Sequence, residues 1–494
     1  MSNAPDSLPK KIALHMEALN AHRKRVHRYD TESVTLTVSK RLRSIETNFE
    51  LARQCPHNYL YDILKLSIEG YPRRYGSQRQ LSDSDLLKLC RFYEEPHHPQ
   101  IDIAEAEGDP ICMALNWIAV CQFPFQEHVN ATDMGRAIEL YTRSGFASEI
   151  GAHFQNHTGL TCQDYLLGCL ILYTQARTRL YISTKPPRLN LSLCSSDRWR
   201  TFLAHVALAP EAFAEKLKTA QDVTSALYAH ANPPVLQIYP AIQFPSNIVA
   251  IPWPMFVAGR VCYGIYDILK ASCGNSFTQN FGHTLQSYVE RLLNVLSEHE
   301  QLAYHPDREL DRTEEQPDFV VVHGLTMMSV EVKAIEDRVY INRNTLIRDA
   351  HGTLGKAVNQ CAKLWSRCQT KAEPSLSHQT FNLHLVLVVT WKPFFWANNS
   401  FYRQALERPE WDSGSKRYQV ICIKEFEALV ALSLSTHRSI CDLVAQKVVT
   451  VPCDSWGGFL AKIISESPFQ PSIPGITNQF EKLTSELLAS VSGT

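Results

Sequence analysis

Two carboxylates and one ammonium group are closely spaced in the segment PDFVVVHGLTMMSVEVKA. Asp318 precedes an apolar run, and a second apolar run, which follows a Gly-containing turn, carries Glu331 and Lys333. On a strand, residues i and i+2 point to the same face, so Glu331 and Lys333 are expected to project together beside Asp318 of a hairpin. Charged groups are costly in a core unless they are paired or bind a metal. The pattern therefore indicates a divalent-metal site suited to a phosphodiester.

Helices and strands of suitable length are predicted on both sides of this hairpin. Apolar residues at steps of three and four predict one long helix from about Thr278 and another from about Thr353. The apolar run 382–391 has the length of a buried strand. Residues from Tyr418 are expected to begin as a strand and to become helical near Lys424. The predicted order, helix–β–β–β–helix–β with a late βα unit, is that of an α/β core.

The first half of the chain has a helical pattern that points to no specific function. The predicted helices begin near Ser82, Asp109, Ala131, Thr161, Ser195 and Pro210. Ser82, Asp85 and Thr161 are of the residue types that start helices. The segment 232–256 is too rich in proline for a long helix, so we expect a packed connector or short strands there and a domain boundary near residue 240.

The expected organisation has three parts. Residues 1–240 form a mainly α-helical domain that would sense a target, a partner or an activating state, and could bind nucleic acid. Residues 241–450 form an α/β domain with a central mixed sheet. Residues 451–494 form a helical extension that packs on the core, and its amphipathic helix from Asn478 could also support a homo-oligomer.

Composition limits the classes of function. The formal net charge of -1 provides no global field that would attract nucleic acid, so any DNA-binding surface must be a local patch. The 14 cysteines have irregular spacing with no CxxC pair, which favours thiols buried in a reducing compartment over zinc sites. No apolar run approaches the ~20 residues of a membrane span. We therefore expect a cytoplasmic protein without a membrane partner.

The arrangement of motif and elements resembles the PD-(D/E)xK nuclease superfamily, whose fold is restriction-endonuclease-like. Asp318 stands where that family has the acid of its PD dipeptide, and Glu331 and Lys333 stand where it has (D/E)xK. Gln360 matches a glutamine that the helix after the third strand often supplies. The resemblance covers roughly residues 255–440 and leaves the helical half unexplained.

The resemblance implies a Mg²⁺-dependent endonuclease that hydrolyses DNA, with Mn²⁺ as a substitute metal. The side chains of Asp318 and Glu331 and the backbone carbonyl of Val332 would supply oxygen ligands, which Mg²⁺ prefers. Lys333 would orient the attacking water or neutralise charge on the phosphate. Gln360 would complete the catalytic set.

One position departs from the family pattern. Related first helices commonly place an acid where this chain has Gln286, in GHTLQSY. Glu290 lies one turn later and could compensate, because residues i and i+4 share a helix face. Loss of the acid would favour a single-metal site or weaken metal binding.

Alternative functions remain open at this stage. A nuclease-like scaffold without activity could bind nucleic acid or a partner protein, and an active enzyme could cleave RNA. No ATP-binding loop GxxxxGK[ST] occurs, so an ATP-driven step would need a partner subunit, such as an ATPase encoded nearby. A helical half combined with this core resembles prokaryotic defence effectors against phage or plasmid DNA.

Three other segments have weaker signals. The basic run from His22 to Ser44 could contact phosphates, but a solvated helix face is the usual meaning of such a run. The segment 71–79 interleaves arginine with tyrosine, which could stack on bases or form a surface loop. His97-His98 could suggest a metal, but no third ligand has a defined spacing, so a loop is expected.

Overall fold

The structure is a computed structural model of the 494-residue chain. It describes residues 8–48, 50–51, 55–71, 79–94, 131–143, 147–223, 235–299, 302–310, 315–336, 343–394, 397–398, 418–452 and 455–465, together with the single residues 473, 476, 481 and 485. The predicted helix from Asp109, the His97-His98 pair and most of the segments 71–79 and 478–490 lie outside the described residues.

The chain forms two compact units of mixed α/β structure. The first unit comprises residues 1–130, 150–269 and 482–494, and the second comprises residues 131–149 and 270–481. The division therefore falls near residue 269, not near residue 240. Residues 241–250 stay with the first unit because they form strands that pair with strands of the helical half.

The helices of the first unit include α1 (Leu8–Val26), α2 (Thr31–Thr47), α4 (His57–Glu69), α5 (Asp83–Cys90), α10 (Cys162–Thr178), α11 (Ser196–Val206), α12 (Pro210–Val223), α13 (Val235–Ile238) and most of α9 (Ala147–Thr158). Three of them, α2, α5 and α10, begin where the sequence supplies a capping side chain. The side chain of Ser82 accepts a hydrogen bond from the backbone N–H of Asp85, and that of Thr161 accepts one from Asp164. These caps satisfy backbone donors that a helix start otherwise leaves unpaired, and they confirm the predicted starts of α5 and α10.

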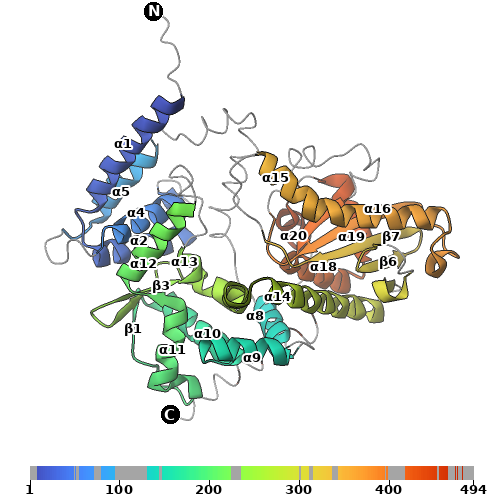
Figure 1. Ribbon diagram of the computed structural model, residues 1–494, viewed down its shortest axis with the longest axis horizontal. Helices are drawn as coiled ribbons and strands as arrows, with labels where there is room; N and C mark the ends of the chain where they lie inside the picture. The colour runs from blue at the N-terminus through green and yellow to red at the C-terminus, as the bar shows by residue number, and fades with distance from the viewer. Residues whose placement is uncertain are drawn as a thin grey trace, which may run out of the picture. The chain divides into compact units, whose positions relative to one another are not determined.

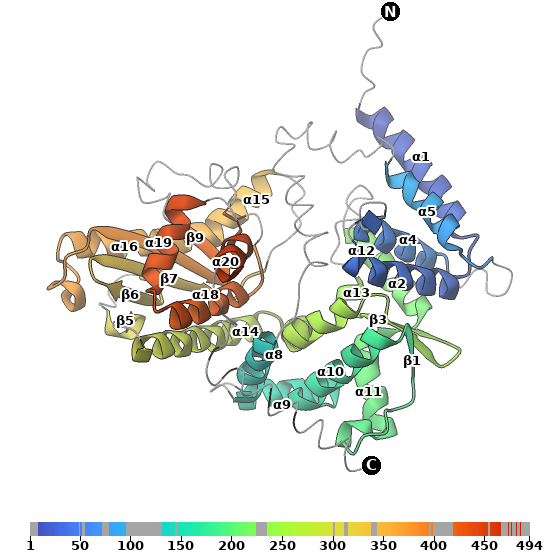
Figure 2. The same cartoon turned by 180° about the vertical axis from the view of Figure 1, so that it is seen from behind.

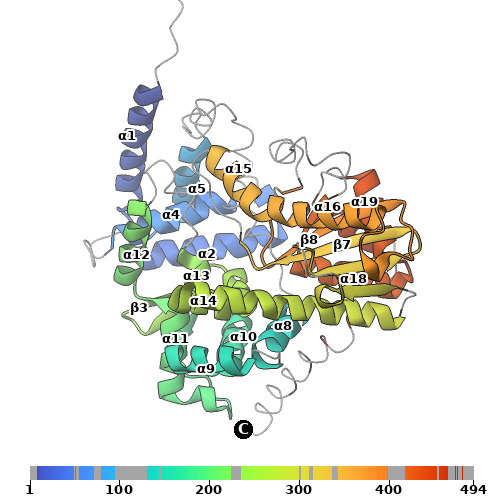
Figure 3. The same ribbon diagram turned by 45° about the vertical axis from the view of Figure 1, so that its right-hand side comes forward.

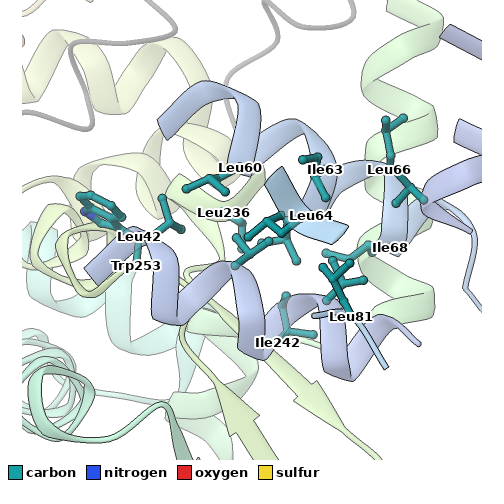
Figure 4. Packing of buried hydrophobic residues seen from close by; sticks show 14 of the residues in the cluster. Leu42, Leu60, Ile63, Leu64, Leu66, Ile68, Leu81, Leu236, Ile242 and Trp253 are labelled. Carbon is teal, nitrogen blue, oxygen red and sulfur yellow. The ribbon is translucent and has the colours of Figure 1, made fainter. Parts of the chain in front are cut away.

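Apolar side chains spaced by four residues build the core of the first unit (Figure 4). Val34, Val38 and Leu42 form one buried stripe along α2, and Leu60 and Leu64 form another along α4. Helical periodicity places each stripe on one face, and the two helices pack through these faces. Among the basic residues between Arg23 and Arg43, those from Arg23 to Arg25 end α1 and those from Lys40 to Arg43 lie on α2, whereas Arg28 lies between the two helices.

A four-stranded mixed sheet interrupts the helical half. Two of its strands lie within the segment 232–256, where a packed connector or short strands were expected, and the other two were not predicted. Its strands are β1 (Tyr181–Ser183), β2 (Ala207–Leu208), β3 (Ala241–Phe244) and β4 (Ile248–Ala250), in the order β1-β4-β3-β2. Only β2 and β3 are parallel. These strands are two to four residues long, too short for an alternating pattern to be recognised in a sequence.

The second unit is built on a five-stranded mixed sheet (Figure 1). Its strands are β5 (Ala303–Pro306), β6 (Phe319–His323), β7 (Thr326–Lys333), β8 (Leu383–Thr390) and β9 (Tyr418–Cys422), and they lie in sequence order. Strands β5, β6 and β7 are antiparallel, whereas β7, β8 and β9 are parallel. The predicted hairpin is confirmed: Gly324 takes a positive φ of 56° in its turn, a conformation that glycine adopts without strain.

Helices cover both faces of this sheet. Helix α16 (Lys356–Gln369) contacts β7 and β8, and Figure 3 shows it in front of the sheet. The reverse view in Figure 2 shows α19 (Ile440–Thr450) in front, on the opposite face. The remaining helices of this unit are α15 (Arg343–Ala350), α18 (Ile423–Thr436), α20 (Trp456–Ser465) and the second part of α14. Burial from both sides explains why the sequence of β8, LHLVLVVT, is almost continuously apolar.

Helix α14 (Pro254–His299) contributes to both units. Residues 261–271 and the stretch from about Thr278 both have helical periodicity, which predicts two helices here. The structure joins them and departs from helical geometry only at Gly274, with φ 61° and ψ −137°. This conformation is strained for residues with a side chain, so a glycine at this position allows the change of direction.

The segment 131–149 is inserted into the second unit through a buried ionic cluster. Arg136 of α8 (Ala131–Ile138) is 1% exposed and donates to Asp133 and to Glu427 of α18. Tyr288 donates to the other oxygen of Glu427 at 2.5 Å, and Lys424 lies 3.1 Å from Asp133. Buried charges require such compensation, which fixes α8 against α14 and α18.

Most described cysteines are free thiols, as expected, but one pair is not. Cys55 and Cys90 form a disulfide between the start of α4 and the end of α5, inside the first core. Their separation of 35 residues gave no pattern by which to pair them. The other described cysteines are free, and the thiols of Cys162, Cys169 and Cys361 are buried.

No individual helix within the described ranges combines the length and apolarity needed to cross a bilayer. Helices α18 and α19 meet those criteria only when taken together, and they are bent by 115° at the break between them.

Candidate metal-binding and catalytic site

The hairpin β6–β7 brings Asp318, Glu331 and Lys333 to one end of the second sheet. Asp318 directly precedes β6, and Phe319 pairs with Val330, so Asp318 lies beside Glu331 of the antiparallel neighbour. Glu331 is 2% exposed, and its carboxylate forms an ion pair with the ammonium of Lys333. The prediction that these two side chains share a face is confirmed.

Backbone N–H groups hold the two carboxylates in place. Val332 donates its N–H to Oδ2 of Asp318 at 2.7 Å, and Asp318 donates its own N–H to Oε2 of Glu331 at 3.1 Å. The carboxyl groups are therefore bound crosswise between the two strands. Fixed backbone donors keep such groups in a single geometry before any ligand arrives.

The electrostatic environment of the pair disfavours two negative charges. Burial and the repulsion of Glu331 raise the pKa of Asp318 to about 7, although the N–H of Val332 and the charge of Lys333 oppose the shift. Burial also raises the pKa of Glu331, despite its contact with Lys333. A cation placed between the carboxylates would relieve this repulsion and restore both charges.

Lys333 remains an ammonium in this environment. Burial favours its neutral form, but attraction to Glu331 prevails and raises the pKa of Lys333 above its ordinary value. Its side chain is 27% exposed, so the group reaches solvent at the edge of the sheet. A charged donor at the rim of a carboxylate pair can contact an incoming anion.

Gln286 of α14 contacts the site directly. Its side-chain Nε2 donates to Oδ1 of Asp318 at 3.0 Å. Glu290 does not replace the missing acid at this position, because its carboxylate forms an ion pair with Arg308. The first helix therefore contributes a neutral hydrogen-bond donor where a third carboxylate was considered.

Gln286→Glu should increase the affinity for Mn²⁺ by about tenfold, because a third carboxylate adds charge and an oxygen ligand to the site. Calorimetric titration of Mn²⁺ into the wild type and the variant measures this change. Gln279→Glu adds the same charge at an exposed position of the same helix and should leave the affinity unchanged. An unchanged or weaker affinity of Gln286→Glu would show that the amide bond to Asp318 is needed to form the site.

Two glutamines next to the hairpin have buried oxygens without a donor. Nε2 of Gln360, on α16, approaches the backbone oxygen of Gln316 at 3.5 Å, and Nε2 of Gln316 donates to the backbone oxygen of Asp307 at 3.0 Å. The side-chain oxygens of both residues are buried and accept no hydrogen bond. Buried acceptors normally have a partner, so these oxygens suit a bound water or cation. Gln360 thus lies beside the hairpin as predicted, but its amide is not hydrogen-bonded to either carboxylate.

The oxygen atoms of the site are of the type that a hard divalent cation prefers, but the protein supplies only a few of them. Asp318 and Glu331 provide carboxylate oxygens, and the unsatisfied amide oxygens of Gln316 and Gln360 are of the same hard type. Within the part of the chain that the structure describes, no group of three or more His, Cys, Asp or Glu side chains could hold a metal. A divalent cation bound here would keep several waters, because the protein supplies few ligands.

Several residues around the site were not identified from the sequence. The thiol of Cys361 is fully buried close to both carboxylates, and burial raises its pKa far above the ordinary value. Glu336 follows Lys333 by three residues and binds Lys270 and Lys392. Because Glu336 is only three residues from Lys333, the sequence could have indicated that Glu336 lies near the site. Its two lysine partners are remote in sequence, so no local pattern indicates them.

Comparisons with known proteins do not assign this chain to a family. No family model matches the sequence, and neither the search of curated proteins nor the search of solved structures returned a match.

Proposed function

We propose that this protein is a metal-dependent nuclease that hydrolyses DNA phosphodiester bonds. The proposal is carried by one observation, the convergence of Asp318, Glu331 and Lys333 at the end of a five-stranded sheet. A role in defence against foreign DNA is part of the proposal and rests on the combination of a helical half with this core. The strand order of the sheet and the positions of helices α14 and α16 beside the hairpin also support a nuclease function.

Each residue has a definite task in this proposal. Asp318 and Glu331 would hold Mg²⁺, with the amide oxygens of Gln316 and Gln360 hydrogen-bonded to waters around it. The bound ion would polarise the phosphate and lower the pKa of a bound water. Lys333 would place its ammonium against the phosphate oxygens, where negative charge increases in the transition state. Gln286 would keep Asp318 in its binding orientation.

The decisive test is cleavage by the purified full-length protein. Supercoiled, linear duplex and single-stranded DNA are incubated with Mg²⁺ or Mn²⁺, and matched RNA is incubated in parallel. Metal-dependent breaks that EDTA prevents are expected in DNA. Breaks confined to RNA would reassign the substrate, and the absence of any cleavage, with the protein alone or with its genomic neighbours, would overturn the proposal.

The raised pKa of Asp318 predicts a pH dependence of stability in the absence of metal. The folded protein retains this proton up to about pH 7, whereas the unfolded chain releases it near pH 4, so stability is lost as the pH rises between these values. Asp318→Asn cannot lose the proton. The change in free energy of unfolding between acidic and basic buffer should therefore be smaller in the variant by about 1–3 kcal/mol.

Urea unfolding of the wild type and of Asp318→Asn across this pH range, with EDTA present, measures the effect. Asp442→Asn, at an exposed position of α19, is the control and should preserve the wild-type pH dependence. Equal pH profiles for the wild type and Asp318→Asn would mean that Asp318 is ionised in the folded protein.

A second candidate is a scaffold that binds nucleic acid or a partner protein without cleaving. It is favoured by the amide of Gln286, which already occupies Oδ1 of Asp318, and by the small number of acidic ligands in the described part of the chain. Calorimetry with Mn²⁺ separates the two candidates. Binding by the wild type that Asp318→Asn abolishes supports the enzyme, whereas no heat from either protein supports the scaffold.

A further inference from the structure

Helix α2 of the first unit carries an arginine with an unfilled hydrogen-bonding edge. Arg41 lies beside the core residue Leu42, and its side chain is only partly exposed. Its Nε and Nη2 atoms are shielded from solvent and have no hydrogen-bond partner among the described residues. Buried donors and buried charges normally have partners, so this edge of the guanidinium is suited to a group that the protein does not itself supply.

The position of Arg41 follows from a row of polar residues along α2. Ser33, Thr37 and Arg41 share one face, because residues four apart lie above one another on a helix. The first two bind the chain just before α5: the N–H of Leu81 donates to Oγ of Ser33 at 2.8 Å, and Oγ1 of Thr37 donates to the backbone oxygen of Leu81 at 3.0 Å. Arg41 lies one turn beyond these contacts, at the border of the first core.

The charges nearest to Arg41 in α2 do not balance it. The negative end of a helix dipole acts mainly within the last turn, which in α2 contains no basic residue. Lys40 is exposed directly before Arg41, and Arg43 follows two residues later, with its Nη2 donating to the backbone oxygen of Ile251 at 3.4 Å. These neighbours increase the local positive charge, which favours an anion at this part of the helix.

The two unpaired atoms belong to the edge of the guanidinium that binds oxyanions in a bidentate manner. Nε–H and one N–H of Nη2 point in the same direction, so they can donate in parallel to two oxygens of one anion. The planar group fixes this geometry before a ligand arrives. A phosphate suits the surroundings better than a carboxylate, since a free phosphate has nearly two charges, a nucleic acid has a row of them, and Lys40 adds a second cation.

We propose that Arg41 anchors a phosphate-binding site in the first unit and binds two oxygens of the phosphate through Nε and Nη2. The phosphate belongs either to the backbone of a nucleic acid or to a small free phosphate, and both present the same pair of oxygens. The site goes beyond the proposed cleavage and does not depend on it. It gives the helical half of the chain a ligand of its own.

Thermal unfolding of the full chain in phosphate-free buffer tests whether the edge is unpaired. Arg41→Met keeps the apolar stem and removes the buried charge, so its melting temperature should exceed that of the wild type by about 2–4 °C. Arg177→Met removes an exposed charge of α10 in the same unit and should leave the melting temperature unchanged. A lower melting temperature of Arg41→Met would mean that the protein itself pairs the guanidinium, which overturns the proposal.

Binding measurements identify the source of the phosphate. Sodium phosphate and sodium acetate of equal ionic strength are compared by their effect on the melting temperature, and a fluorescent DNA duplex is followed by anisotropy, with EDTA present to prevent metal-dependent cleavage. Arg41→Lys should weaken the binding of phosphate or DNA about tenfold, because lysine keeps the charge but loses the parallel pair of donors. Arg177→Lys is the matched control and should bind as the wild type does.

The outcomes separate two sources of phosphate from failure of the proposal. A dependence on Arg41 with both phosphate and DNA supports a site for a small free phosphate, whereas a dependence with DNA alone supports a contact to the nucleic acid backbone. Equal affinities of the wild type and Arg41→Lys, acetate binding as tight as phosphate binding, or no binding of phosphate or DNA overturns the proposal. The nuclease is judged by cleavage alone, so its failure leaves these outcomes unchanged.

Discussion

Lys333→Ala, Asp318→Asn and Glu331→Gln should each reduce metal-dependent DNA cleavage by at least about a thousandfold. The lysine forms an ion pair with Glu331, and the two acids supply the charged oxygens of the site. The loss should appear in the turnover number, because charge stabilised in the transition state is removed. Gel assays of nicked and linearised plasmid, followed over time at saturating Mg²⁺, measure the rates.

Controls separate this effect from unfolding. Lys462→Ala removes an exposed ammonium in the same unit and should retain wild-type activity. Glu331→Gln keeps the size of a buried side chain, so its melting temperature should not fall below that of the wild type. Wild-type cleavage rates in Lys333→Ala or Glu331→Gln would place the catalytic centre elsewhere in the chain.

Arg136→Met should destabilise the second unit by about 3–5 kcal/mol, the cost of leaving buried charges without their partner. Arg136 binds two buried carboxylates, those of Asp133 and Glu427, and its guanidinium lies 6.0 Å from the ring centre of Trp391. Methionine fills the volume but provides no charge. Urea unfolding at neutral pH measures the loss.

The pH dependence and a second substitution test the cause. Burial already raises the pKa of Glu427 to about 7, and removing Arg136 raises it further, so the defect should shrink in acidic buffer, where Glu427 is protonated. Adding Glu427→Gln should recover part of the lost stability. Arg200→Met, at an exposed pair with Asp197, should change stability by less than about 0.5 kcal/mol. If Arg136→Met lost the same free energy of unfolding at all pH values, the cause would be altered packing and not the loss of the charge.

Local sequence patterns predicted only part of the fold. The hairpin, the helix α16 and the strands β8 and β9 were predicted close to their observed bounds, because continuous apolar runs between turn signals mark buried strands. Strand β5 has four residues with no distinctive pattern, and its place in the sheet depends on pairing with β6. The short strands β1 and β2 were missed for the same reason, whereas β3 and β4 lie where short strands were one of two expectations.

The candidate site shows the same division between local and tertiary information. The sequence by itself determined that Glu331 and Lys333 share a face and that Asp318 lies on the adjacent strand, since strand periodicity and a tight turn leave no other register with the apolar residues inside. It also showed the glutamine at position 286. These features depend on residues within one hairpin or one helix.

Tertiary structure alone decided which distant groups meet these residues. Three contacts show this. Gln286 donates a hydrogen bond to Asp318, Glu290 pairs with Arg308, and two lysines share the carboxylate of Glu336. Each contact joins segments that are separated in the chain or that lie outside the hairpin. Arg136 likewise brings α8 into the second unit across 291 residues. Local periodicity specifies the face on which a side chain lies, whereas burial and charge pairing select its partner from the whole chain.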